Sequence, residues 1–144
     1  MRTRIGYRVT ADDSVRALPF SEEFYSRKPD VMASGRLVAM CEWPCMDLLR
    51  TRITPLECSL GVWQRMEHLA PIVIGAELVI EATCTLLRRR YSEWDVTVHD
   101  EAERVGAAQL GFVTVDQGEF ESTRLRRKPS PAAVVLAEPA TITR

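Results

Sequence analysis

Hydrophobic and polar positions follow a helical period from Gly35 to Arg50. Apolar side chains recur there every three or four residues, as in a helix with a wide buried stripe: Leu37, Met40, Cys41, Pro44, Cys45, Leu48 and Leu49. Pro44 lies inside this stripe and removes one backbone hydrogen bond. We therefore expect a kink at Pro44, or the end of a first half of the helix.

Beyond the helix the period changes to two, which is typical of strands that bury one face. Residues 60–69 are a strand candidate, and residues 76–91 and 93–100 alternate clearly between apolar and polar positions. A hairpin turn is expected at 101–106, followed by a last strand at 107–116. These strands follow one another through short connections, so the pattern predicts antiparallel pairing.

Before the helix, the pattern predicts a short first strand at 5–10, and then a connection at 11–30 that holds a loose turn of helix. The simplest architecture is α+β, with one long central helix wrapped by a curved antiparallel sheet. We assign residues 1–117 to this domain. Residues 118–144 lose the periodicity and are rich in Pro, Ala and Arg, so we expect a tail that is poorly ordered or draped on the surface.

Composition and charge argue against nucleic-acid binding and against a membrane span. The chain has 144 residues, 46% of them hydrophobic, which suits one packed domain. The net charge of −1 gives no basic excess for nucleic acid, and no apolar run is long enough to span a membrane. The N-terminus lacks the apolar region of a signal peptide, so we expect a cytoplasmic protein. We interpret a late basic cluster as a solvated charge run rather than a phosphate site: Arg124, Arg126, Arg127 and Lys128.

The four cysteines are irregularly spaced, and in a reducing compartment we expect free thiols that pack as small hydrophobes. Cys41 and Cys45 share a helix face and could bind zinc together with Cys58, Cys84 or His68. No pair with typical zinc-finger spacing is present, so we expect no metal site.

Three polar residues have surroundings that invite a functional interpretation. Glu42 interrupts an apolar run, so its carboxylate either faces a cleft or pairs with an arginine such as Arg36 or Arg50. Ser34 precedes the helix, where a serine hydroxyl either caps the helix or binds a carbonyl group. His68 ends a strand candidate, and most such histidines are structural or simply exposed. Spacing alone does not join these residues, because eight residues of straight helix from Ser34 to Glu42 span about 12 Å.

Three ordered segments carry a family resemblance: the V-M-A-S-G segment at 31–35, M-C-E-W-P-C at 40–45, and a G-V-W-Q-R-M-E-H stretch at 61–68 that leads into P-I-V-I-G. Together they resemble the fluoroacetyl-CoA thioesterase-like branch of the hot-dog superfamily, over residues 31–115. The hot-dog fold is the same arrangement of one helix and an antiparallel sheet that the periodicity predicts.

The resemblance implies hydrolysis of an acyl-CoA thioester, with Ser34, Glu42 and His68 as the catalytic group. Ser34 would act as a nucleophile or position the carbonyl or the water. Glu42 would be the nucleophile or the base that activates water, and His68 would transfer or stabilise protons. The position of Gly61 is associated with substrate or oxyanion binding, and the helix amides near Gly35 are a further oxyanion-hole candidate.

The same resemblance implies a homodimer or a dimer of dimers, with no metal or organic cofactor and with CoA as part of the substrate. A carrier-protein thioester is the alternative substrate, and neither nucleic acid nor a membrane is expected as a partner. Arg88, Arg89 and Arg90 are candidates for binding the CoA phosphates.

Several departures from the family pattern argue against fluoroacetyl specificity, while they leave general thioesterase chemistry in place. Met32 replaces an aromatic residue, Pro44 replaces an alanine, and Ser34 stands where the fluoroacetyl enzyme has threonine. The arginine of the last strand has no clear counterpart in A-A-Q-L-G-F-V-T-V, and E-E-F-Y-S-R-K-P-D lacks the lid phenylalanine at the equivalent place.

Three rival functions remain. A non-catalytic hot-dog protein that binds acyl-CoA or another acyl ligand would keep the pocket but would not need both Glu42 and His68. A hydratase or dehydratase of this fold would carry an N-P-x-H segment, which the sequence lacks. A structural module would leave the cost of Glu42 in an apolar helix unexplained.

Overall fold

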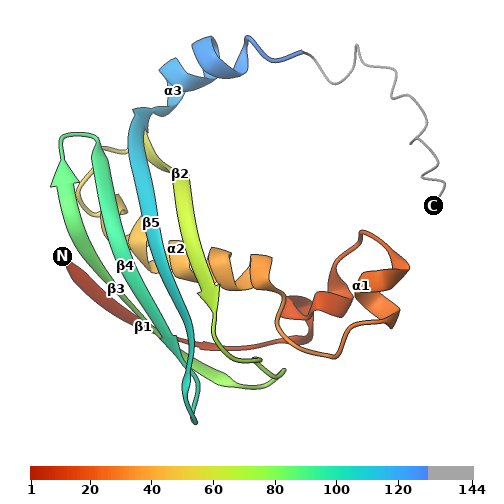
Figure 1. The fold of residues 1–144 in the computed structure, drawn as a ribbon. Coiled ribbons are helices and arrows are strands. Elements are labelled where there is room, and N and C mark those ends of the chain that lie inside the picture. Colours follow the sequence, from red (N-terminus) through yellow and green to blue (C-terminus); the bar gives the residue numbers. More distant parts are fainter. Residues whose placement is uncertain (130–144) are drawn as a thin grey trace.

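The computed structural model describes residues 1–129, which form a curved antiparallel sheet around one long helix (Figure 1). The helix is α2 (Ser34–Arg50), and the strands are β1 (Arg2–Arg8), β2 (Glu57–His68), β3 (Glu77–Arg88), β4 (Tyr91–His99) and β5 (Arg104–Asp116). Their order in the sheet is β1-β3-β4-β5-β2, and every neighbouring pair is antiparallel. The predicted α+β architecture is therefore confirmed.

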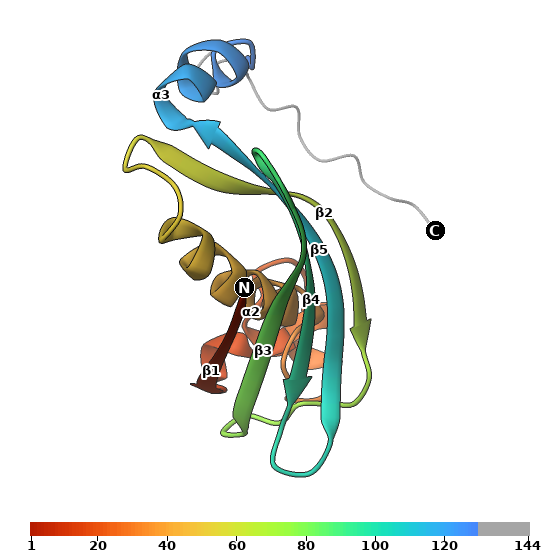
Figure 2. The ribbon, with the colours of Figure 1, turned by 90° about the vertical axis from the view of Figure 1, so that its left-hand side faces the viewer.

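The hydrophobic core lies between α2 and the concave face of the sheet, which bends around the helix in Figure 2. The helix contributes the buried Leu37, Cys41 and Cys45, all fully inaccessible to solvent. Strands β3 and β4 contribute alternate residues, including Ile80 and Trp94. The period-two pattern thus predicted correctly which face of these two strands packs in the core.

Helix α2 begins at Ser34, one residue before the predicted start, and ends at Arg50 as predicted. It does not end at Pro44, because this proline lies within one continuous helix. The side chain of Pro44 is buried with the apolar stripe. Packing of that stripe against the sheet outweighs the loss of one backbone hydrogen bond.

Three strands begin three residues earlier than predicted. The first strand was predicted at 5–10, but β1 runs from Arg2 to Arg8. Strand β2 begins at Glu57, three residues before the predicted start at 60. Strand β5 begins at Arg104 and not at 107, because the hairpin turn is tighter than predicted and His99 pairs with Arg104. Asp100 closes this turn, since its carboxylate accepts hydrogen bonds from the backbone of Ala102 and Glu103.

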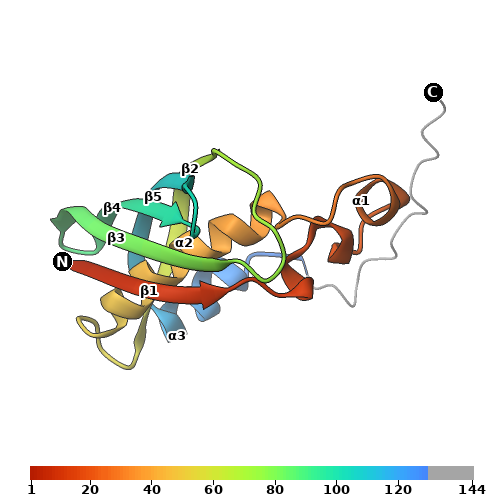
Figure 3. The same ribbon diagram turned by 90° about the horizontal axis from the view of Figure 1, so that it is seen from below.

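The connection at 11–30 holds two short 3-10 turns and α1 (Glu22–Ser26), which projects beyond the end of the sheet in Figure 3. After β5, the chain continues into α3 (Gln117–Phe120) and a π-helical turn (Glu121–Leu125). The pattern did not predict this helical segment at the start of the expected tail. Residues 130–144 lie outside the described part of the chain. Within the described part, no helix is long and apolar enough to cross a membrane.

Candidate active site

Ser34 and His68 meet at the N-terminal end of α2. The Oγ atom of Ser34, the first residue of α2, lies 3.0 Å from Nδ1 of His68, the last residue of β2. Ala33 occupies the N-cap position, so Ser34 lies inside the helix and its hydroxyl faces His68. The contact joins two of the three predicted catalytic residues, which are separated by 34 positions in the sequence.

The imidazole of His68 is arranged to stay neutral. Its second nitrogen, Nε2, is buried and has no hydrogen-bond partner among residues 1–129. Burial lowers the pKa of His68, and the backbone of Ala70 offsets only part of this effect. A neutral imidazole can accept a proton near neutral pH and then pass it on to a leaving group.

Glu42 lies on α2 beside β2. A Cβ atom on Gly61 would be only 2.7 Å from Oε2 of Glu42, so the carboxylate occupies the space that a side chain at position 61 would fill. Glu42 and Gly61 line one cavity of about 300 Å³ together with Val62, Trp63 and Gln64. Burial raises the pKa of Glu42 above the ordinary value for a glutamic acid.

The arginines considered as partners of Glu42 bind elsewhere. Arg36 forms an ion pair with Asp13, with 2.7 Å between Nη2 and Oδ1. Arg50 donates hydrogen bonds to the backbone carbonyls of Thr54 and Glu57. Among residues 1–129, Glu42 forms no ion pair. Of the two interpretations of Glu42, the structure therefore matches the carboxylate that faces a cleft.

The structure thus brings Ser34 and His68 into contact and places Glu42 separately, beside Gly61. Glu42 follows Ser34 by eight residues, or about 12 Å along the helix axis. His68 and Gly61 both belong to β2, so this strand faces the helix at both points. Ser34 with His68 at one end, and Glu42 at the other, could contact one extended substrate between them.

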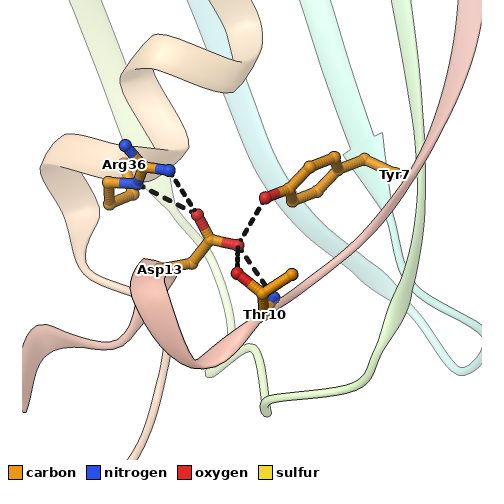
Figure 4. A network of polar contacts seen from close by, with 4 residues as sticks. All are labelled: Tyr7, Thr10, Asp13 and Arg36. Carbon is orange, nitrogen blue, oxygen red and sulfur yellow. Dashed lines mark hydrogen bonds and ion pairs between the residues drawn. The ribbon is translucent and has the colours of Figure 1, made fainter. Parts of the chain in front are cut away.

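A buried network that the sequence analysis missed lies next to Arg36, two residues beyond Ser34 (Figure 4). Asp13 is fully buried, and its Oδ1 accepts hydrogen bonds from Nε and Nη2 of Arg36 at 3.0 and 2.7 Å. Its Oδ2 accepts from the Tyr7 hydroxyl at 2.6 Å and from the Thr10 amide at 2.9 Å. Burial alone would raise the pKa of Asp13, but these donors outweigh it and lower the pKa.

The network also holds the start of α2. The backbone carbonyl of Asp13 accepts a hydrogen bond of 2.8 Å from the amide of Ala33, the N-cap residue. Asp13 therefore contacts both the N-cap and the first turn of the helix that carries Ser34. The signal in the sequence was the T-x-x-D pattern from Thr10 to Asp13, which is typical of a capped turn.

All four cysteines are free, and Cys41 and Cys45 are buried. Burial raises the pKa of the Cys41 thiol to about 12, so this thiol stays protonated at neutral pH. Within residues 1–129, no three side chains of the types that ligate metals are grouped closely enough to hold an ion.

Comparisons with known proteins identify the fold and the family of this chain. The structure superposes on that of the fluoroacetyl-CoA thioesterase FlK with a TM-score of 0.84 and 25% identity, over 90% of this chain and 96% of the other. A hot-dog-like protein from Thermanaerovibrio acidaminovorans matches with a TM-score of 0.76 and 17% identity, over 90% and 92% of the two chains. The fold is therefore the hot-dog fold, as the sequence predicted.

The particular family follows from the sequence. The profile of the fluoroacetyl-CoA-specific thioesterase family matches residues 9–117. The fluoroacetyl-CoA thioesterase of Streptantibioticus cattleyicolor is 28% identical over 134 residues, which cover 88% of this chain and 96% of that protein. The chain belongs to the fluoroacetyl-CoA-specific thioesterase family. This membership confirms both the resemblance stated from the three motifs and the expected enzyme class, a thioester hydrolase.

Proposed function

We propose that the protein hydrolyses a small or medium acyl-CoA thioester to the free acid and CoA, with Ser34, Glu42 and His68 as its catalytic group. The observation that carries this proposal is the pairing of the Ser34 hydroxyl with His68, a half-buried histidine whose pKa is lowered by burial, on the helix and strand that also place Glu42 beside Gly61. A structure of a FlK variant with fluoroacetate and CoA matches this chain with a TM-score of 0.79 and 26% identity, over 83% of this chain and 96% of that one.

In this mechanism the ionised carboxylate of Glu42 attacks the thioester carbonyl, or removes a proton from the water that does so. The C–S bond breaks, and the thiolate of CoA takes up a proton that His68 first accepts from the attacking water and then transfers. If Glu42 is the nucleophile, a water then hydrolyses the acyl-enzyme to the free acid and restores the carboxylate. Ser34 holds the imidazole through Nδ1 and contacts the carbonyl or the water with its hydroxyl. Mass spectrometry of the enzyme quenched during turnover distinguishes the routes, because attack by Glu42 leaves the acyl group on Glu42, attack by Ser34 leaves it on Ser34, and attack by water forms no acyl-enzyme.

The oxyanion of the tetrahedral intermediate needs hydrogen-bond donors, and the first turn of α2 supplies the candidates. The N–H groups of Ser34 and Gly35 belong to the first turn, where backbone amides have no partner within the helix. A Cβ on Gly35 would meet no atom within 4 Å, so the space beside this turn is open to a substrate. Gly61 contributes by leaving room for the Glu42 carboxylate.

The test is release of free thiol from a panel of acyl-CoAs with short, long, branched and aromatic acyl groups. We expect the wild type to hydrolyse at least one of them and Glu42→Gln to lose about 10³-fold or more in kcat/KM. Asp47→Asn is a matched control, since Asp47 is an exposed carboxylate on the same helix. The panel includes fluoroacetyl-CoA, which the departures at Met32 and Ser34 lead us to expect as a poor substrate.

Two results would contradict the proposal. Equal turnover by wild type and Glu42→Gln would remove Glu42 from the mechanism. Tight binding of acyl-CoA without turnover of any acyl-CoA or carrier-protein thioester would identify an acyl-ligand binding protein instead. Circular dichroism of each variant shows whether a loss of turnover arises from unfolding.

We also propose a homodimer, or a dimer of such dimers, joined through the free edge of β2. This strand ends the sheet and is twelve residues long, and an unpaired edge of that length favours pairing with another strand. The side chains of Val62 and Trp63 on it are 50% and 40% exposed. Because Val62 and Trp63 line the Glu42 cavity, a partner at this edge would border the active site.

Light scattering after size-exclusion chromatography tests the dimer. The wild type should elute as a dimer or tetramer, and Val62→Lys should shift it toward the monomer. Val73→Lys is the matched control, because Val73 is 59% exposed and lies outside β2. A monomeric wild type, or equal dissociation by both variants, would contradict this interface.

The proposed mechanism requires no metal or organic cofactor. A cytoplasmic location of the protein stays a prediction.

A further inference from the structure

One polar side chain lies on the inner face of β2 between the two ends of the candidate active site. Directly paired residues of neighbouring strands point to the same face of a sheet. Three residues of β2 pair with core residues of β5 and therefore face α2: Gly61, Gln64 and Met66. The register shifts between Gly61 and Trp63, so Gly61 and Gln64 share this face although they are three positions apart. Gln64 is thus the polar group between Gly61 and His68.

Gln64 also lines the cavity of about 300 Å³ that contains Glu42. At about 3.3 Å per residue, Gln64 lies about 10 Å from Gly61 and about 13 Å from His68 along β2. A thioester carbonyl that reacts with Glu42 must approach its carboxylate to about 3–3.5 Å, or through one water. Because Glu42 and Gln64 line the same small cavity, the acyl group on that carbonyl lies within reach of the Gln64 amide.

The amide of Gln64 is available to a ligand. The residue is exposed, and among residues 1–129 its side chain takes part in no hydrogen bond. A primary amide offers two N–H donors and a carbonyl acceptor. A plain alkyl chain would cover these groups without pairing them, which weakens binding, whereas an acyl group with an oxygen substituent would pair with them.

Charge and volume narrow the kind of acyl group. The ionised carboxylate of Glu42 in the same cavity would repel an acyl group that carries a carboxylate of its own. The cavity volume lies at the lower end of the range for organic ligand sites, so it suits a short chain. Met66, the next residue on this face, is apolar and packs against the core, so it offers no second polar contact.

We propose that Gln64 selects the acyl group, because its side-chain amide binds a hydroxyl or keto oxygen on a short, uncharged acyl chain close to the thioester. The inference rests on the proposed thioesterase function and names the class of acyl group on which it acts. Gln64 contacts the substituent of the substrate and takes no part in breaking the C–S bond.

The experiment measures kcat/KM for acyl-CoAs of equal chain length. Butyryl-CoA is compared with hydroxybutyryl-CoAs that carry the hydroxyl on C2 or on C3, and with succinyl-CoA. The variant is Gln64→Met, which keeps the length of the side chain and removes the amide. The matched control is Gln109→Met, because Gln109 is also exposed but lies between two core residues of β5 and so faces the opposite side of the sheet.

We expect the wild type and Gln109→Met to favour one hydroxybutyryl-CoA over butyryl-CoA at least about tenfold, and Gln64→Met to reduce this preference to about twofold or less. Succinyl-CoA should be the poorest of these substrates. Gln64→Leu repeats the test with a second apolar side chain, and a thermal melt shows that each variant is folded.

Four results would overturn the proposal. They are a wild type without the preference, a preference that survives in Gln64→Met, the same change in Gln109→Met, and succinyl-CoA as the best substrate. An equal loss by Gln64→Met on every acyl-CoA would overturn it as well, since the amide would then bind the thioester carbonyl or the pantetheine arm that all of them share.

Direct binding separates this inference from the hydrolytic function. The probes are S-butyl-CoA and S-hydroxybutyl-CoA, thioethers that have no carbonyl group and are not hydrolysed. In calorimetry, the wild type should bind the hydroxylated thioether at least about fivefold more tightly, and Gln64→Met should bind the two equally. This result would support the role of Gln64 even if no thioester were hydrolysed. A wild type that hydrolyses butyryl-CoA and the hydroxybutyryl-CoAs equally well would retain the proposed function and overturn this inference.

Discussion

The carboxylate of Glu42 occupies the space that a side chain at position 61 would fill, since a Cβ on Gly61 would lie 2.7 Å from Oε2 of Glu42. The glycine and the glutamate therefore form one structural unit, although they belong to different elements. This unit explains how a helix that buries most of one face can carry a carboxylate. The strand opposite leaves a gap, and the carboxylate points into a cavity rather than into the core.

Gly61→Ala tests this relationship. The new methyl group would displace the end of a flexible side chain, so we expect little loss of stability but a fall in kcat/KM of about 10- to 100-fold. Gly6→Ala is the control, because its Cβ would meet only the Leu78 carbonyl oxygen at 3.8 Å. Kinetics and a thermal melt of each variant separate the two effects. Unchanged kinetics in Gly61→Ala would show that the position of Glu42 is not critical.

The hydrogen bond between Ser34 and His68 predicts that their substitutions are not additive. His68→Gln should lower kcat by about 10²-fold, because it removes the group that transfers protons. Ser34→Ala should lower kcat less, since the imidazole remains but loses its contact at Nδ1. Ser34→Thr keeps a hydroxyl and serves as the conservative control.

In the double variant, Ser34→Ala with His68→Gln, the loss should be close to that of His68→Gln alone. Losses that simply multiply would mean that the two side chains act independently, despite the 3.0 Å between Ser34 Oγ and His68 Nδ1. Steady-state kinetics on the best acyl-CoA from the panel measures the three single variants and the double variant.

Much of the fold was predictable because its pattern is local. The apolar stripe located α2 within one residue, and alternation identified the core face of β3 and β4. The starts of β1, β2 and β5 were missed, because Arg2, Glu57 and Arg104 are polar residues whose strand conformation comes from pairing with the neighbouring strand. Of the two alternatives at Pro44, the end of a first half of the helix was wrong, because packing, which the pattern does not contain, holds the helix together.

The site was predictable only in part. The surroundings of Glu42 singled it out from the sequence, but the contact of Ser34 with His68 depends on how β2 folds back along α2. The motifs of the family supplied that information, and spacing could not. Arg36 pairs with Asp13 from a distant turn rather than with Glu42, because residues six apart on a helix point in different directions.

The pKa shifts of Glu42 and His68 predict how activity depends on pH. Burial raises the pKa of Glu42, so its ionised, active form is lost at a higher pH than for an ordinary glutamic acid. Burial lowers the pKa of His68, so this group remains neutral to a lower pH than an ordinary histidine. We therefore expect kcat/KM to fall on acidification. The midpoint of this acid limb of the pH profile should lie below the ordinary pKa of histidine.

The pH profile of kcat/KM measures this limb in the free enzyme. In His68→Gln, the remaining activity should depend on Glu42 alone and should keep a limb above the ordinary glutamic acid pKa. The same limb should be absent from any residual activity of Glu42→Gln. A profile centred on the ordinary histidine value would contradict the effect of burial on His68.

The buried Asp13 makes a prediction about stability rather than chemistry. Asp13→Asn keeps the shape of the side chain but removes the charge that binds Arg36, Tyr7 and Thr10. We expect a loss of about 2–3 kcal/mol in the free energy of unfolding at neutral pH, or about 10 °C in Tm. Asp12→Asn is the control, because Asp12 is exposed and adjacent in sequence.

The sign of the pH dependence follows from the lowered pKa of Asp13. A carboxyl group whose pKa is lower in the folded state stabilises the fold above its unfolded pKa. This contribution disappears as the pH falls through the folded pKa, where Asp13 takes up a proton. The difference in stability between wild type and Asp13→Asn should therefore be full at neutral pH and should shrink in strong acid. Urea unfolding across that range measures it, and a difference that did not change with pH would mean that shape, and not charge, makes Asp13 stabilising.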